Sequence, residues 1–310
     1  MPFFHVYGFF YSLKSVVVSE TVVVMERFDL RKMMKAVEEF RVTNAAAAPP
    51  MVVAMAMAKE DVAEGYDLRS LEGVGCGGSP LAKEVITAFK AKFPFVWLLQ
   101  GYGLAESTRT AFRAVTPEEC ERWGSVGRLP GNCQAKIVDP HTGIALPPCN
   151  RWELWIRGPM VMKGYVGNKE ATSATLLADG WLRAGDLCYI DNEGFLFIVD
   201  RLKELIKYKG YQVPPAKLEQ LLQSDPEIVD AAVVPYLDEE VGQVPMAFVV
   251  RHSQSNLNEA QVMDFVAKQV ASYKKIRRVA FVNSIPKSPA GKILRKELRK
   301  IAIPPTFSKL

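Results

Sequence analysis

The sequence predicts an α/β protein in which a parallel sheet is followed by a small all-β unit and then by a small α+β domain. Three observations lead to this prediction. Apolar strand-like runs alternate with amphipathic helices up to about Trp123, short strands punctuated by Gly and Pro follow, and after Asp200 helices and strands alternate again. Alternating strands and helices favour a mainly parallel sheet that binds ligands at the carboxyl ends of its strands. We expect domains at residues 1–200 and 201–310.

Local signals define the elements expected before Trp123. Asp29 precedes an amphipathic run and is a suitable N-cap. Gln100-Gly101-Tyr102-Gly103 contains two glycines and is expected to form a tight turn after a strand. The expected helices are Leu30–Phe40, Met51–Lys59 and Leu81–Lys92. The expected strands are Val16–Val18, Val22–Met25, Leu71–Cys76 and Phe95–Leu99, and a short apolar run lies at Thr43–Ala48.

The elements expected later in the chain differ in length and spacing. Short strands separated by turn residues are typical of a compact β unit. Those expected after Trp123 are Ala135–Val138, Trp152–Ile156 and Phe195–Val199. After Asp200 we expect helices at Pro214–Leu222, Asn258–Val270 and Lys292–Lys300, and strands at Val229–Val234, Met246–Val250 and Arg278–Val282.

Charge and composition narrow the class of protein. The 310 residues are 49% hydrophobic and 24% charged, as in a globular protein of one large or two ordinary domains. The net charge of +5 is uneven, because Arg201–Leu310 carries +7 and the remainder −2. A basic C-terminal part predicts an anionic partner. No helix-turn-helix, zinc or RNA-binding motif indicates that this partner is nucleic acid.

Cysteine usage and apolar runs indicate the compartment. The five cysteines are odd in number and contain no C-x-x-C, so we expect a reduced, intracellular protein. No apolar run approaches the roughly 18–20 residues that span a bilayer. The chain ends in Ser308-Lys309-Leu310, a peroxisomal address that an import receptor reads at a free C-terminus. We therefore expect a peroxisomal protein with that receptor as a partner.

Two stretches carry a resemblance to a known family. Pro286–Lys300 reads PKSPAGKILRKELRK, and Gln100–Thr108 reads QGYGLAEST. Together they resemble the adenylate-forming enzymes, which include the acyl-CoA synthetases, the 4-coumarate–CoA ligases with their plant peroxisomal relatives, and the luciferases. The resemblance covers essentially the whole chain. It implies a carboxylate–CoA ligase in which the acid attacks the α-phosphate of ATP, and the CoA thiol then displaces AMP from the acyl-adenylate.

This chemistry needs no protein nucleophile, because the protein must position anions and neutralise developing charge. The resemblance makes Lys292 the catalytic lysine that reaches the acyl carboxylate and the α-phosphate. It makes Gln100, Gly101 and Tyr102 nucleotide-binding residues, with the ring of Tyr102 against adenine. Glu106 is the expected Mg²⁺ ligand, acting through the phosphates.

One position departs from the family pattern. The residue before Glu106 is usually a threonine whose hydroxyl contacts phosphate, and here it is Ala105. Losing one hydrogen bond to a charged group costs about 1.5–3 kcal/mol, unless Ser107 or Thr108 substitutes. Ala105 is still expected to line the acyl-adenylate site.

The resemblance assigns further residues near Asp200. Asp186 is expected to accept hydrogen bonds from both ribose hydroxyls, because a carboxylate suits a diol, and Arg201 to contact the same ribose. Asp200 becomes a hinge about which the C-terminal domain swings between adenylation and thioester-forming poses. Lys203 and Lys207 are expected to face the acyl-adenylate.

Five other residues are assigned by the same resemblance. His5 is expected to form an aromatic lid over the acyl pocket, which Ser79 would line. Arg27, Lys209 and Gly210 are expected to meet CoA, since a glycine lets the pantetheine pass close to the backbone.

The resemblance also implies an upstream segment of about two hundred residues with a Ser-Gly-Thr-rich phosphate loop. No such loop, including G-x-x-x-x-G-K, occurs in this sequence, so we expect an N-terminally truncated family member. Two alternatives to an active ligase remain open here. One is a non-catalytic chain that binds nucleotide, CoA or a partner, and the other is luciferase-like oxidation of the adenylate.

Overall fold

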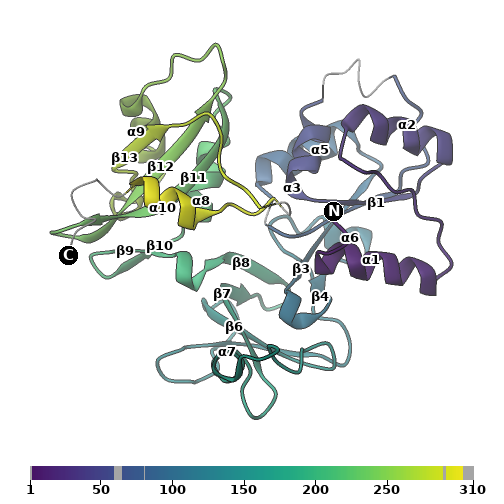
Figure 1. Ribbon diagram of the computed structural model, residues 1–310, viewed down its shortest axis with the longest axis horizontal. Helices are drawn as coiled ribbons and strands as arrows, with labels where there is room; N and C mark the ends of the chain where they lie inside the picture. Colours follow the sequence, from purple (N-terminus) through teal and green to yellow (C-terminus); the bar gives the residue numbers. More distant parts are fainter. Residues whose placement is uncertain (1, 59–64, 80, 289–290, 303–310) are drawn as a thin grey trace. The chain divides into compact units, whose positions relative to one another are not determined.

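The computed structural model describes residues 2–58, 65–79, 81–288 and 291–302. The chain folds into two compact units (Figure 1). Unit 1 comprises Met1–Ala184 and Cys188–Ile198, and unit 2 comprises Gly185–Leu187 and Val199–Leu310. Within the described ranges, no helix is long and apolar enough to cross a membrane. The predicted succession of a parallel α/β sheet, a β unit and an α+β domain is confirmed.

Unit 1 begins with a four-stranded sheet. Its order is β1 (Asn44–Ala47), β2 (Gly73–Cys76), β3 (Trp97–Gly103) and β4 (Thr110–Arg113). The first three strands are parallel, and β4 pairs antiparallel with β3. The helices of this part are α1 (Val6–Val17), α2 (Leu30–Phe40), α3 (Pro49–Ala56) and α5 (Lys83–Lys92). The Asp29 carboxylate accepts a hydrogen bond from the Lys32 amide at 2.9 Å, which confirms it as the N-cap of α2.

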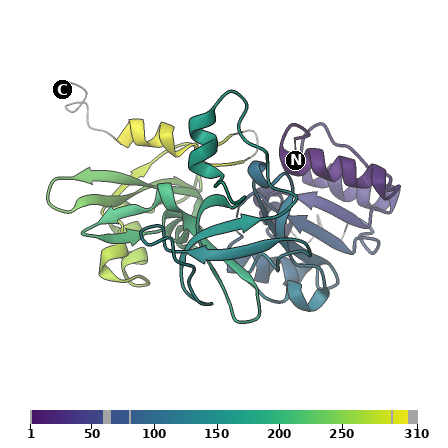
Figure 2. The same cartoon turned by 90° about the horizontal axis from the view of Figure 1, so that it is seen from below.

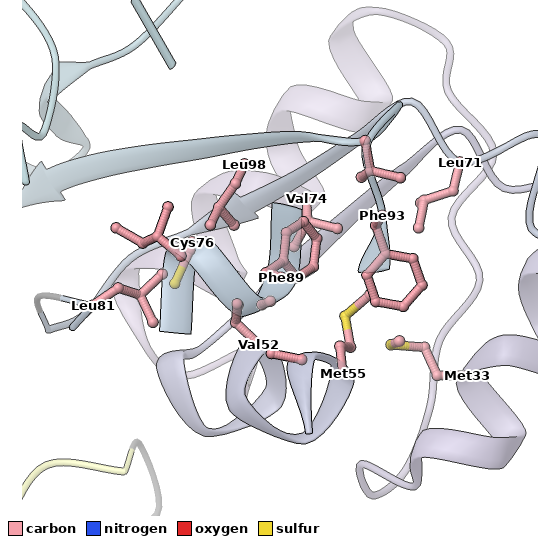
Figure 3. Packing of buried hydrophobic residues seen from close by; sticks show 14 of the residues in the cluster. Met33, Val52, Met55, Leu71, Val74, Cys76, Leu81, Phe89, Phe93 and Leu98 are labelled. Atoms are coloured by element: carbon pink, nitrogen blue, oxygen red, sulfur yellow. The ribbon is translucent and has the colours of Figure 1, made fainter. Parts of the chain in front are cut away.

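Helices cover both faces of this sheet. Alternate residues of a strand point to opposite faces, and Val74 and Cys76 of β2 enter a buried cluster with helix residues (Figure 3). Gly75 lies between them, and its carbonyl accepts a hydrogen bond from the Tyr7 hydroxyl of α1 at 3.0 Å. α1 therefore covers the opposite face from α3 and α5. The labelled cluster contains Met33, Val52, Met55, Leu71, Val74, Cys76, Leu81, Phe89, Phe93 and Leu98.

The two valine-rich strands expected near the N-terminus are wrong. Val16 and Val17 end helix α1, with 78% and 82% of their surfaces exposed, and 22–25 has no regular structure. His5 caps α1, since its Nδ1 accepts a hydrogen bond from the Tyr7 amide at 3.2 Å. The helix started there extends through the valines, because β propensity is realised only where a strand finds a partner to pair with.

The tight turn expected at Gln100–Gly103 is also wrong, because β3 continues to Gly103. Tyr102 pairs with Phe112 of β4, and the register shifts between Tyr102 and Gly103. A Cβ on Gly103 would lie 2.7 Å from the Arg109 carbonyl oxygen. In the described structure this glycine therefore permits close approach between β3 and the connection to β4.

A second sheet follows, in the order β5 (Gln134–Val138), β6 (Trp152–Arg157), β7 (Leu182–Ile190) and β8 (Leu196–Arg201). Three of its strands were predicted, and β7 was missed. Its buried side chains include Ile137, Leu154, Leu182 and Leu196, which pack with Phe112. The short helices in this region are η1 (Ala105–Ser107), α6 (Pro117–Cys120) and α7 (Lys169–Thr175).

Unit 2 is a sheet between helices. Strands β9 (Ile206–Tyr208), β10 (Tyr211–Val213), β11 (Ile228–Asp238) and β12 (Gly242–Arg251) run in the order β10-β9-β12-β11, and β13 (Arg278–Phe281) also pairs with β12. Its helices are η2 (Leu202–Glu204), α8 (Pro215–Leu222), α9 (Glu259–Ala267), η3 (Ser272–Lys274) and α10 (Arg295–Ala302).

Alternation along β11 separates the two faces of this sheet. Ala231 and Val233 pack with α8 and α9, whereas Ala232 and Val234 pack with Leu298 of α10. Figure 2 shows α9 and α10 on opposite sides of the sheet. The result is a three-layer α+β arrangement with two separate apolar cores.

Candidate functional site

In unit 1, several of the predicted residues lie at the carboxyl ends of β2 and β3. Cys76 pairs with Gln100. A Cβ on Gly77 would lie 3.5 Å from the Gly101 carbonyl oxygen and 3.8 Å from Cε1 of Tyr7. Tyr7 thus brings the start of α1, with His5 as its cap, to this end of the sheet. Burial raises the pKa of the Tyr7 hydroxyl well above its usual value.

Tyr102 and Ser79 differ in exposure. Tyr102 is half-buried in β3, and its ring lies 6.4 Å from that of Phe112, centroid to centroid, at a tilt of 59°. Ser79 is exposed in the loop after β2. Tyr102 at the end of β3 and Ser79 after β2 therefore lie at the carboxyl edge of the sheet, which is where an α/β sheet binds its ligands.

Glu106 lies on η1, directly after β3, and is held by an unpredicted partner. The Tyr165 hydroxyl donates a hydrogen bond to Glu106 Oε1 at 2.7 Å, and this bond raises the pKa of Tyr165. Among the described residues, no group of three or more His, Cys, Asp and Glu side chains could hold a metal ion. Glu106 could therefore contribute one carboxylate ligand to an ion held mainly by phosphates.

The hydroxyls that could replace the family's threonine are used elsewhere. Ser107 is fully buried, and its hydroxyl donates to the Arg109 carbonyl at 2.8 Å. Thr108 has φ of 59°, and its hydroxyl donates to the Met160 carbonyl at 2.7 Å. Ala105 is exposed on the same turn. The described geometry therefore gives no replacement for the missing hydroxyl.

In unit 2, Asp186 and Arg201 come together from neighbouring strands. Arg201 Nε lies 3.6 Å from Asp186 Oδ1, and the side chain of Asp186 is only 5% exposed. Asp186 is therefore a buried carboxylate beside a cation within strand β7, and not an aspartate on a surface turn. Such a group can accept two hydrogen bonds from a ligand diol.

Asp200 is buried, and its carboxylate organises the start of α8. Its Oδ1 accepts a hydrogen bond from the Arg201 amide at 2.7 Å, and its Oδ2 accepts one from the Ala216 amide at 2.9 Å. Pro214, at the N-cap position, supplies no side-chain cap. Asp200 thus caps α8 from a distant point in the chain. Burial raises its pKa, and the bonds from the two amides act in the opposite direction.

The lysines after Asp200 lie on short elements of unit 2. Lys203 is exposed on η2, and Lys207 is exposed on β9, where its amide donates to Gln243 Oε1 at 2.9 Å. Lys209 and Gly210 connect β9 to β10, with φ of 45° and 82°. Two successive residues at positive φ form a type I′ hairpin turn. Lys209 occupies this conformation although it is not a glycine.

Lys292 lies on a loop before α10, so the expected helix start at Lys292 is wrong by three residues. The segments 286–288 and 291–294 form a stem. The Leu294 amide donates to the Pro286 carbonyl at 2.9 Å, and the Ser288 amide donates to the Lys292 carbonyl at 2.8 Å. The Lys292 carbonyl is engaged by the stem and not by a helical hydrogen bond, so the helix begins only after Lys292. Pro289 and Ala290 lie outside the described residues.

The remaining predicted residues are not brought together by these contacts. Arg27 is exposed in an irregular segment before α2. The terminal Ser308-Lys309-Leu310 lies outside the described residues.

Sequence reasoning missed a buried charge in unit 2. Arg295 Nη2 lies 2.6 Å from Glu219 Oε2, and Glu219 Oε1 accepts a hydrogen bond from the Val233 amide at 2.8 Å. Burial raises the pKa of Glu219, and the Arg295 guanidinium opposes this shift. The available signal was the position of Glu219 between Leu218 and Leu222 on the apolar face of a helix. A charge there requires a partner.

Comparison with known families places these features in a class. A family model described as AMP-binding enzyme matches residues 1–166, and one described as AMP-binding enzyme C-terminal domain matches residues 217–292. The first match alone covers more than half of the chain. The chain therefore belongs to the AMP-binding enzymes.

Relatives within the family carry ligase names. The chain is 57% identical over 310 residues to 4-coumarate–CoA ligase-like 9 of Arabidopsis thaliana, covering 100% of this chain and 55% of the relative. It is 54% identical over 303 residues to peroxisomal OPC-8:0-CoA ligase 1 of the same plant, covering 97% and 56%. The chain thus spans about half the length of the curated relatives it matches.

Solved structures share the fold. ATP-bound MatB from Rhodopseudomonas palustris matches with a TM-score of 0.87 at 26% identity, covering 97% of this chain and 59% of that one. The o-succinylbenzoate CoA synthetase MenE from Bacillus subtilis, in complex with ATP and magnesium ion, matches with a TM-score of 0.85 at 29% identity, covering 96% and 60%.

Proposed function

We propose that this chain is part of an ATP-dependent carboxylate–CoA ligase that acts through an acyl-adenylate. Membership of the AMP-binding enzymes over residues 1–166 and 217–292 supports this function. The structural observation that carries it is the buried Asp186 carboxylate beside Arg201, because the pair offers paired acceptors and a cation to a nucleotide ribose. A carboxylate and ATP give acyl-adenylate and pyrophosphate, and the CoA thiol then gives acyl-CoA and AMP.

Residues at the carboxyl ends of β2 and β3 receive the adenylate in this proposal. Tyr102 offers a flat ring to adenine, and Gln100 and Gly101 lie on the same strand next to it. His5 and Ser79 line the acyl side, as does Ala105. The position of α1 against the end of β2 supports this assignment of His5.

Lys292 is the proposed catalytic residue. Its ammonium would neutralise charge that develops on the α-phosphate as the acid attacks, and the hydrogen-bonded stem supports a defined position for it. Lys203 and Lys207, both exposed, would contact the acyl-adenylate. Arg27 and the Lys209-Gly210 turn would contact CoA, whose phosphates suit cations.

Glu106 is the proposed protein ligand of Mg²⁺. One carboxylate combined with substrate phosphates is a common way to hold this ion, and the Tyr165 hydroxyl would orient the carboxylate. When bound, the ion would offset negative charge on the phosphates of ATP. The magnesium ion in the complex of the B. subtilis synthetase supports this requirement.

We further propose that Asp200 is the hinge between domains at residues 1–200 and 201–310. The division of the structure into two compact units supports this boundary, because unit 2 contains Val199–Leu310 and, from earlier in the chain, only Gly185–Leu187. A peroxisomal location and binding of the import receptor are supported by the terminal Ser308-Lys309-Leu310 and by the name of one relative. The names of the relatives make OPC-8:0 and 4-coumarate the first acids to test.

The proposed function is tested by measuring acyl-CoA formation. The purified chain is supplied with ATP, Mg²⁺, CoA and a panel of aromatic and fatty acids. We expect turnover with at least one acid, and Lys292→Ala should lower its rate by roughly 10²–10³, the usual cost of removing one preorganised charge-stabilising group. Lys296→Ala, an exposed lysine on α10, is the matched control and should retain the wild-type rate.

Two outcomes would contradict this proposal. Equal rates in Lys292→Ala and Lys296→Ala would remove Lys292 from catalysis. Absence of turnover, with AMP or CoA still bound in equilibrium dialysis, would favour the non-catalytic alternative. This alternative is tested because the chain spans only about half the length of its curated relatives.

A further inference from the structure

Two ion pairs flank the loop that carries Lys292. Lys287 Nζ lies 2.6 Å from Asp230 Oδ2, and Arg295 Nη2 lies 2.6 Å from Glu219 Oε2. The first pair is at one end of the stem and the second is just beyond the other end. The chain between them contains the catalytic candidate.

Both carboxylates are themselves fixed by α8 and β11. Asp230 Oδ1 accepts hydrogen bonds from the Ala231 amide at 3.0 Å and from Gln223 Nε2 at 3.2 Å. Glu219 Oε1 accepts from the Val233 amide. β11 is the outer strand in the order β10-β9-β12-β11, and the two carboxylates satisfy amides of this edge. The anchors therefore belong to a helix and an edge strand that pack together in the apolar core of unit 2.

Burial makes these ion pairs costlier to break than ordinary surface pairs. The side chains of Arg295 and Glu219 are 16% and 9% exposed, and those of Lys287 and Asp230 are 31% and 20% exposed. By contrast, Lys268 and Asp264 on α9 are 72% and 62% exposed at the same N–O distance of 2.6 Å. Exposed pairs contribute little, whereas breaking a buried pair leaves an uncompensated charge.

We propose that Asp230 and Glu219 are positioning residues for Lys292. Asp230 fixes one end of the loop through Lys287, and Glu219 fixes the other end through Arg295. The two ion pairs thereby hold the Lys292 ammonium in the position where it contacts the reacting groups. The catalytic part of this inference rests on the proposed role of Lys292. The position of Lys292 matters for the rate, because a displacement of a catalytic group by about 1 Å costs on the order of 10²-fold in rate.

The first test follows the loop without requiring activity. In Asp230→Asn, amide hydrogen exchange at Leu294, measured by mass spectrometry, should become about three- to tenfold faster, since one partly buried ion pair no longer holds the stem closed. In the same variant, the rate at which N-hydroxysuccinimidyl acetate acetylates Lys292 should also differ from the wild-type rate. Asp264→Asn removes the same charge from an exposed pair and should change neither value.

Breaking the same ion pair from the loop side separates positioning from loss of the anchor's own hydrogen bonds. Lys287→Gln leaves Asp230 with its bonds from the Ala231 amide and Gln223 Nε2, and exchange at Leu294 should accelerate as it does in Asp230→Asn. Failure of Asp230→Asn to accelerate exchange beyond Asp264→Asn overturns the inference, and so does failure of Lys287→Gln to accelerate it. Glu219→Gln should also accelerate exchange, and the Asp230 and Lys287 variants decide the inference if this one fails to fold.

The second test uses turnover of whichever acid the wild-type chain accepts. Asp230→Asn should lower kcat about tenfold and leave KM for ATP unchanged, because the lysine is displaced and the nucleotide contacts remain. An unchanged kcat together with faster exchange overturns the catalytic part. If the wild-type chain gives no turnover, the proposed function fails, and the exchange measurements alone decide whether the ion pairs fix the loop.

Discussion

Lys209 is a residue whose backbone conformation is unfavourable for its type. Its φ of 45° lies in the left-handed region, where Asn-Gly is the preferred pair for a two-residue hairpin turn. Strained residues of this kind are found preferentially at functional sites. The conformation therefore agrees with the proposed contact between the Lys209-Gly210 turn and CoA.

Replacing Lys209 by asparagine should separate stability from binding. Lys209→Asn should raise the free energy of unfolding by up to about 1 kcal/mol, because asparagine tolerates the left-handed region better. It should also weaken CoA binding, because the cation is removed. Thermal unfolding and isothermal titration with CoA measure the two effects.

Arg41 provides the matched control for this change. It ends α2 at φ of 50° and is also exposed. Arg41→Asn should give a similar gain in stability with unchanged CoA affinity. Unchanged CoA affinity in Lys209→Asn as well would remove Lys209 from the proposed CoA site.

At the scale of elements, the continuation of β3 through Gly103 decides where the nucleotide-binding residues lie. The Cβ that any other residue would place at position 103 falls 2.7 Å from a backbone oxygen that has little room to move. The strand, the turn at η1 and β4 are therefore fitted to one another at this point. Glu106 follows three residues later.

Gly103→Ala should destabilise unit 1 by about 1–3 kcal/mol, the usual cost of overpacking a well-fitted site. A lowered midpoint of urea unfolding measures this loss. Gly131→Ala is the control, since a Cβ there meets no atom within 4 Å. Equal midpoints for the two variants would show that the β3–β4 connection yields at little cost.

Sequence patterns predicted elements best where local signals and tertiary contacts agree. Asp29 marked the start of α2 correctly, because an N-cap depends on residues three positions away. The valine run of α1 and the glycines of β3 misled because their structure depends on distant partners, Gly75 for α1 and Phe112 for β3. Strand β7 was missed because Gly185 and Asp186 resemble a turn.

The candidate site shows the same limit. Motifs identified Asp186 and Arg201, and the structure brings these two together across neighbouring strands. No motif identified the Tyr165 hydroxyl that holds Glu106, since 59 positions separate them in sequence. The cap that Asp200 places on α8 likewise depends on a contact between residues 16 positions apart.

At the scale of the whole molecule, exposed apolar side chains gather in the first 28 residues. Phe4, Phe9, Val16, Val17 and Val24 are each more than half exposed. Contiguous exposed apolar surface promotes association.

The purified chain should therefore associate at increasing concentration. Phe9→Lys combined with Val17→Lys should shift sedimentation velocity profiles toward the monomer. Leu237→Lys, which removes an exposed apolar residue of unit 2, should leave them unchanged. A chain that stays monomeric at all concentrations would contradict this prediction.

The cap that Asp200 provides for α8 restricts the axis of the proposed hinge. Rotation about the N–Cα bond of Asp200 turns its carboxylate, Arg201 and α8 together, so both hydrogen bonds survive. Rotation about the Cα–C bond separates the carboxylate from the Arg201 and Ala216 amides and breaks both bonds. The pivot thus has one inexpensive degree of freedom. A glycine at this position would add a second and leave the helix without its cap.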